Sequence, residues 1–189
     1  MLFSILENVA LVLGLVYIIL QVKQNKWMWP VDILCCIATI CVFVHQSLWA
    51  SAGLNLYYLV MGFVGLAAWT KDEKSSDEDG IRIRAMSLKT VFCSIVLFAL
   101  CWAGLYMLLK ASGDPAPLCD AFVGSSGVIG TYWLVKCYVE NWLLWIASDL
   151  ASMALCLTQG LYGLALLYTV YTVVAVVGFI KWRRNGKYI

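Results

Sequence analysis

Long apolar runs separated by short polar breaks dominate the chain. Seven runs approach or reach the roughly 20 apolar residues that a helix needs to cross a bilayer. They are Leu2–Val22, Trp29–Trp49, Leu54–Thr70, Leu88–Leu109, Leu118–Tyr138, Trp142–Leu157 and Tyr162–Trp182. Most connections between them are very short, so successive helices should be antiparallel neighbours. The pattern predicts an all-α membrane protein with seven transmembrane helices.

Two longer breaks divide the chain into three parts. Lys71–Lys89 is polar and contains the acidic run Asp72–Gly80, which predicts a loop. Ala111–Pro117 is rich in proline and glycine and predicts a compact turn. We therefore expect a three-helix unit over 1–70, a cytoplasmic loop with a linker helix and an outer turn over 71–117, and a second three-helix unit over 118–189.

Composition supports the membrane class. Of the 189 residues, 63% are hydrophobic and 13% are charged, which is more apolar side chain than a soluble domain of this length can bury. The eight cysteines show no CxxC spacing and no neighbouring histidine, so they are interpreted as small hydrophobic residues. We expect no metal site, no cofactor and no nucleic-acid partner.

The basic residues predict the orientation in the membrane. With seven spans, twelve of the thirteen lysines and arginines fall on one side, and Lys110 stands alone on the other. Positive charge accumulates on the cytoplasmic side of membrane proteins. The N-terminus is therefore expected outside and the C-terminus in the cytoplasm.

A polar stripe runs along the sixth predicted helix. At about 100° per residue, one face collects two indoles, an amide and a carboxylate. Its members are Asn141, Trp142, Trp145, Asp149, Ser152 and Cys156. Asp149 lies about 12 Å along the axis from Asn141, near the middle of the bilayer core. An ionisable residue at that depth indicates a functional site.

Two sets of residues recur along the chain. Gly14, Asn25 and Trp29 recur 116 residues later as Gly130, Asn141 and Trp145. Tyr58, Gly65 and Trp69 recur 113 residues later as Tyr171, Gly178 and Trp182. The matches predict that helices 1–3 and 5–7 are copies, and the fourth helix makes the copies parallel. This 3+1+3 parallel repeat is a SWEET-like arrangement, in which substrate sites lie near the midplane.

The carboxy-terminal third resembles the PnuC family of vitamin transporters. The resemblance is carried by Glu140–Asp149, Gln159–Tyr162, Leu167–Tyr171 and Gly178–Trp182, and more weakly by Gly14–Tyr17, Leu54–Tyr58, Gly65 and Trp69. It implies a seven-helix fold, a homotrimer and a multi-pass protein of the bacterial inner membrane. It also implies facilitated diffusion of nicotinamide riboside for NAD biosynthesis, with trapping by later phosphorylation.

Two positions depart from the pattern of that family. Asn55 stands where glutamine is expected, and Leu66 follows Gly65 where a tryptophan is usual. Thiamine-carrying relatives are known in the family. The substrate therefore stays open between nicotinamide riboside and another vitamin such as thiamine.

A site for a flat cationic vitamin needs aromatic faces, hydrogen-bonding groups and a negative field. The candidate substrate-binding residues are Trp142, Trp145, Asp149, Asn141, Asn55, Tyr58, Tyr168 and Tyr171. Trp142 could instead belong to an interfacial belt, the tyrosines could be packing residues, and Asp149 could be a structural carboxylate. Asp32 is the rough counterpart of Asp149 in the second helix, where a structural role is favoured.

Two other function classes make different demands on the sequence. A membrane enzyme needs a nucleophile with its base, or a metal cluster. The chain has one histidine and no HExxH, GxSxG or P-loop pattern, so no catalytic residue is assigned and no enzyme is expected. A structural membrane subunit without a substrate of its own remains the other alternative.

Overall fold

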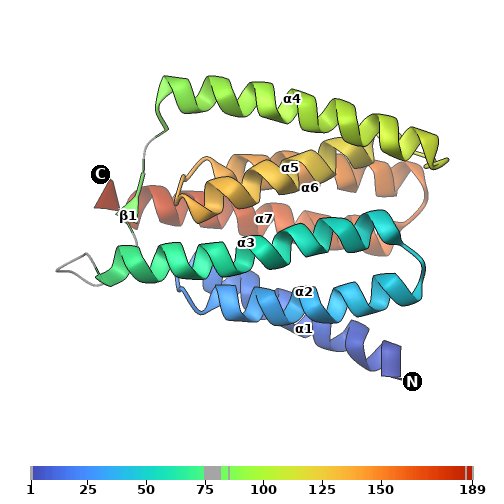
Figure 1. Ribbon diagram of the computed structural model, residues 1–189, viewed down its shortest axis with the longest axis horizontal. Helices are drawn as coiled ribbons and strands as arrows, with labels where there is room; N and C mark the ends of the chain where they lie inside the picture. Colours follow the sequence, from blue (N-terminus) through green and yellow to red (C-terminus); the bar gives the residue numbers. More distant parts are fainter. Residues whose placement is uncertain (1, 75–81, 85, 186, 189) are drawn as a thin grey trace. The chain divides into compact units, whose positions relative to one another are not determined.

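The computed structural model describes residues 2–74, 82–84, 86–185 and 187–188 (Figure 1). These residues form seven helices and two strands of two residues each. The helices are α1 (Leu2–Val22), α2 (Met28–His45), α3 (Trp49–Lys74), α4 (Leu88–Ala111), α5 (Pro117–Val135), α6 (Asn141–Thr158) and α7 (Tyr162–Asn185). The strands are β1 (Arg82–Ile83) and β2 (Lys187–Tyr188).

The helices have the length and surface of membrane spans. Within the described residues, α2 to α7 are each long and apolar enough to cross a bilayer, and α1 contributes a shorter apolar stretch, Asn8–Val22. Large apolar side chains lie on the outside, as with Leu88 at 88% exposure and Met107 at 70%. Lipid is the solvent for such a surface. The predicted all-α membrane class with seven helices is confirmed.

Several predicted boundaries shift. α1 spans the predicted residues, but Trp49, predicted to end the second span, instead begins α3. α3 also continues to Lys74, so the first residues of the predicted loop are helical. Hydropathy does not show this extension, because it reports only the apolar length that crosses the bilayer. A helix can continue into polar residues as long as its backbone hydrogen bonds continue. The rest of the acidic run, 75–80, lies outside the described residues.

The second helix ends early because the backbone turns left-handed at Ser47. That residue has φ +60°, and the Leu48 amide reaches back to the Phe43 carbonyl at 2.8 Å. This is the Schellman pattern, in which a residue with positive φ satisfies the last carbonyls of a helix. Four other helices end in the same way, at Gln24, Gly113, Cys137 and Gly160.

The chain divides into two compact units. The first comprises Met1–Arg82 with Val135–Cys137, and it holds α1, α2 and α3. In Figure 1 these three helices run antiparallel to their neighbours in sequence, and α2 packs against both α1 and α3.

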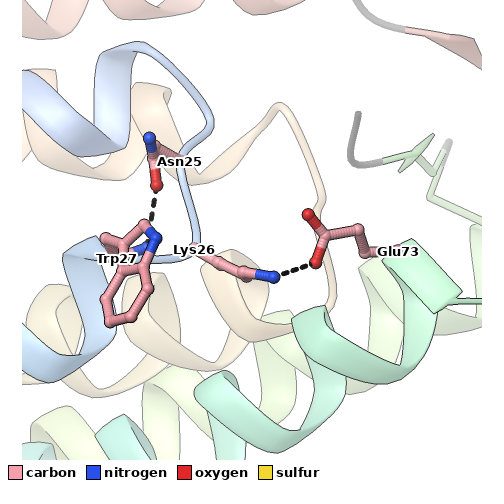
Figure 2. Close-up of polar contacts among 4 residues, drawn as sticks. All are labelled: Asn25, Lys26, Trp27 and Glu73. Atoms are coloured by element: carbon pink, nitrogen blue, oxygen red, sulfur yellow. Dashed lines mark hydrogen bonds and ion pairs between the residues drawn. The ribbon is translucent and has the colours of Figure 1, made fainter. Parts of the chain in front are cut away.

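A tryptophan pair closes one end of the first unit. Trp29 of α2 is fully buried and meets Trp69 of α3 edge to face, with ring centroids 5.5 Å apart. Gly65 makes room for the Trp29 indole, since a Cβ there would lie 2.4 Å from the ring. At the same end, Lys26 forms an ion pair with Glu73 (Figure 2). Both partners are about a third exposed or more, so this pair contributes little stability.

The second unit comprises Ile83–Leu134 and Tyr138–Ile189. α6 packs against α7, and here Trp142 meets Trp182 edge to face at 5.6 Å over Gly178. α4 joins this unit through α5. The Trp133 indole donates to the Ser94 hydroxyl at 3.0 Å, and the Trp102 indole donates to the Leu118 carbonyl.

Several features of the first unit recur 113 residues later in the second. The spacing holds for the bounds of α2 and α6, for the left-handed residues Gln24 and Cys137, and for the tryptophans. Trp29 therefore corresponds to Trp142, and the predicted matches at a spacing of 116 are wrong. Trp142 and Trp145 lie one helical turn apart, so comparison of residue types alone could align either of them with Trp29. Their packing distinguishes them, because Trp142 lies over Gly178 as Trp29 lies over Gly65.

Candidate substrate site

Asn141 and Trp142 occupy the buried start of α6. The Asn141 side chain is fully buried and donates to the Tyr138 carbonyl at 2.5 Å, while its Oδ1 has no hydrogen-bond partner in the described part of the chain. Trp142 is 1% exposed, and its ring packs against Gly178 and Trp182. The Trp142 indole thus supports the α6–α7 contact inside its own unit.

Trp145 lies one turn further along α6 and is half-buried. Its ring faces Gly130 of α5, where a Cβ would lie 3.3 Å from the indole. The indole nitrogen is buried and has no hydrogen-bond partner among the described residues. Because buried polar groups are nearly always paired, this N–H is a donor that a ligand could use.

Asp149 follows Trp145 by one more turn and is also half-buried. No cation pairs with it among the described residues. Tyr168 of α7 forms a side-chain hydrogen bond with Ser152 and lies within electrostatic range of Asp149. Tyr168 also meets Tyr171 edge to face, with centroids 6.3 Å apart. The α6–α7 contact thus gathers a carboxylate, two phenols and a hydroxyl.

The two candidates in the first unit lie on α3. Asn55 is half-buried and its amide donates to the Ser51 carbonyl at 3.0 Å, which leaves its Oδ1 as the remaining acceptor. Tyr58 is half-buried, meets Tyr57 at 5.7 Å and lies within electrostatic range of Tyr17 on α1.

One polar group of the first unit was not selected from the sequence. Tyr17 of α1 lies near Asp32 and Tyr58. At the spacing of 113, Tyr17 corresponds to Gly130 and Asp32 to Trp145. A spacing of 113 residues in the sequence was the signal that could have identified Tyr17. At that spacing, Tyr17 and Asp32 align with Gly130 and Trp145, which contact each other.

The family of the chain follows from comparison with known proteins. A model of the nicotinamide mononucleotide transporter family matches residues 4–184. The chain belongs to this family. The nicotinamide riboside transporter PnuC of Escherichia coli (strain K12) is 26% identical over 172 residues, which cover 77% of this chain and 71% of that protein. The riboflavin/roseoflavin transporter RibM of Streptomyces davaonensis is 24% identical over 180 residues, covering 93% of this chain and 83% of RibM.

A solved structure shares the fold. The crystal structure of the vitamin B3 transporter PnuC matches with a TM-score of 0.75 and 20% identity, covering 96% of this chain and 81% of the other. The predicted membership of the PnuC family is confirmed, and with it a multi-pass membrane transporter of the vitamin class. The eight candidate site residues stay a prediction.

Proposed function

We propose that the protein carries nicotinamide riboside across the inner membrane by facilitated diffusion, and that later phosphorylation in the cytoplasm traps it. The observation that carries the proposal is the group formed by Trp145, Asp149 and Tyr168 at membrane depth on α6 and α7. Within a transporter family, polar groups at that depth mark the substrate path.

The chemistry of this group suits a cationic aromatic substrate. An indole face attracts a desolvated cation by roughly 1–2 kcal/mol. Asp149 has no cationic partner among the described residues, so a pyridinium would neutralise it. The free Trp145 N–H and the phenols of Tyr168 and Tyr171 supply hydrogen bonds for an amide or a ribose. Asn55 and Tyr58 supply the same groups from α3, and Asn141 and Trp142 hold the start of α6.

Transport requires the site to open to each side in turn. The spacing of 113 supports two three-helix repeats, and transporters built from such repeats expose one site to each side in turn. The distribution of basic residues supports an external N-terminus and a cytoplasmic C-terminus. A homotrimer, implied by the family resemblance, completes the proposal.

A second vitamin is the main alternative. Thiamine is also a cationic heteroaromatic molecule, so the same group would bind it. RibM is named for riboflavin and roseoflavin, which makes riboflavin a third candidate. Riboflavin is uncharged and would leave Asp149 without a counter-ion, so the geometry favours the cationic vitamins. A structural subunit would show no binding of any of them.

The test is uptake of labelled vitamins into proteoliposomes of the purified protein. We expect nicotinamide riboside to reach the same concentration inside and outside the vesicles. No ion gradient should be needed, and the internal concentration should not exceed the external one. Thiamine uptake with no uptake of nicotinamide riboside would reassign the substrate. Accumulation well above equilibrium in the absence of a kinase and a gradient would disprove facilitated diffusion.

Two variants connect uptake with the proposed site. Trp145→Ala removes the aromatic face and Asp149→Asn removes the charge, and each is expected to weaken binding of the carried vitamin by about ten-fold or more. Leu150→Ala is a matched control on the exposed side of α6 and should bind as the wild type does. Unchanged binding in both site variants would place the site elsewhere.

A further inference from the structure

The second unit contains an apolar cavity beside α4. Its volume is about 270 Å³, and three helices of the same unit line it. Its apolar lining includes Val91, Ile95 and Phe98 of α4, Phe122 and Ile129 of α5, and Leu144 of α6. Ile95 is 62% exposed, so the cavity opens on the outer surface of α4, where lipid is the solvent.

The polar side chains of the cavity are already paired with each other. The Trp133 indole donates to the Ser94 hydroxyl at 3.0 Å, and both residues line the cavity. A buried water needs about two to four polar partners, whereas an apolar cavity of roughly 150 Å³ stays dry and can bind a hydrocarbon. A vitamin with several hydroxyl groups would lose hydrogen bonds here. The cavity therefore suits a hydrocarbon occupant.

The shape of the cavity favours a single chain. Along α5 its lining runs from Phe122 to Trp133, which is about 16 Å at 1.5 Å per residue. A volume of about 270 Å³ spread over that length is long and narrow. A helix with its side chains is about 10–12 Å across, so a helix of a second copy would not enter. A lipid acyl chain would.

Basic side chains lie at the end of the unit that carries the Ser94–Trp133 hydrogen bond. Lys89 is exposed in the first turn of α4. Arg84 is also exposed, and its backbone forms a bridge with Tyr138, whose amide donates to the Trp133 carbonyl at 2.9 Å. Basic residues at a groove between transmembrane helices attract the headgroups of anionic lipids.

We infer that this cavity holds one acyl chain of an anionic phospholipid, with the lipid phosphate beside Lys89 and Arg84. The chain fills the space between α4 and α5 and holds the two helices together, because it restores the dispersion contacts that the cavity lining lacks. The inference is independent of the proposed function, since none of the cavity residues belongs to the candidate substrate site.

The experiment measures lipid binding by native mass spectrometry. The purified protein in detergent is titrated with dioleoyl phosphatidylglycerol or with dioleoyl phosphatidylcholine, and the lipids retained per chain are counted. We expect one phosphatidylglycerol per chain, bound about ten-fold more tightly than phosphatidylcholine. Lys89→Gln should lower this preference by about five-fold. Lys110→Gln, at the other end of α4, is the matched control and should leave the preference unchanged.

A second pair of variants tests the cavity itself. Val91→Trp fills the cavity from its exposed edge and should weaken binding of both lipids by about ten-fold. Val96→Trp, at an exposed position of α4 outside the lining, is the matched control. Leu144→Phe fills the cavity from α6 and should repeat the effect of Val91→Trp.

Three results would overturn the inference. The first is equal binding of the two lipids by the wild type. The second is unchanged binding of phosphatidylglycerol in both cavity-filling variants. The third is loss of association between copies of the chain in those variants with lipid binding intact, which would assign the cavity to a side chain of a second copy. Uptake of nicotinamide riboside is measured separately, so a failure of the proposed function would leave these results unaffected.

Discussion

A glycine beneath an indole recurs in each unit and fixes how two helices meet. Gly65 lies under Trp29 and Gly178 lies under Trp142, and in both units a second tryptophan closes the contact edge to face. In membranes small residues allow close helix approach, because no hydrophobic effect drives the helices together. At this scale a single methyl group decides whether the indole fits.

Replacing either glycine with alanine should destabilise the protein. A Cβ at position 178 would lie 2.6 Å from the Trp142 ring, and one at position 65 would lie 2.4 Å from the Trp29 ring. Overpacking of this kind costs about 1–3 kcal/mol, so thermal melting of Gly65→Ala and Gly178→Ala in detergent should occur at lower temperature.

The matched controls are Gly53→Ala in α3 and Gly163→Ala in α7, where a Cβ would meet nothing within 4 Å. Alanine favours a helix over glycine, so these variants should melt no lower than the wild type. Equal melting temperatures for the packed and the control glycine variants would contradict the prediction, because the indoles would then move aside without loss of stability.

Most of the helices end at a residue in the left-handed conformation. Among the described residues, five helices end with a residue of positive φ, and two of these five residues, Gly113 and Gly160, are glycines. Gln24, Ser47 and Cys137 adopt the same conformation with a side chain, which is strained. The ends of α2 and α6 correspond. Ser47 and Gly160 therefore adopt the same backbone geometry, one with a side chain and one without.

Exchanging these residue types should change stability in opposite directions. Gly160→Ala should destabilise the protein by about 1 kcal/mol, and Ser47→Gly should stabilise it by a similar amount. Denaturation of both variants in detergent measures the difference. Gly104→Ala, in the interior of α4 with nothing within 4 Å, is the control for a glycine without the turn. A stabilised Gly160→Ala would contradict the role of the left-handed residue.

For the whole molecule, charge outside the spans should decide orientation. Twelve of thirteen basic residues fall on one predicted side. A reporter that is active only in the cytoplasm, fused after Ile189, should therefore be active, and one that is active only outside should be silent. Adding lysines beside Lys110 should increase the fraction of inverted chains. An active external reporter on the unmodified protein would reverse the predicted orientation.

The sequence predicted the number of helices well and their ends less well. The start of α4 at Leu88 and the bounds of α1 were found, because hydropathy changes sharply there. The end of α2 and the start of α3 were missed, because the turn at Ser47 depends on a backbone conformation that serine seldom signals. At the candidate site, Trp145 and Asp149 were selected from one helix face, whereas the packing role of Trp142 required its neighbour on α7 to be known.

By itself, the sequence determined the membrane class, the seven helices and the family, since apolar length and charge act through the bilayer whatever the helices contact. Only the tertiary structure decided the repeat spacing and the partner of each tryptophan. Those depend on which indole meets a glycine on another helix, and that contact joins residues distant along the chain. By the same spacing, Tyr17 corresponds to Gly130 and Asp32 corresponds to Trp145. The pattern of one helix face could not reveal this correspondence.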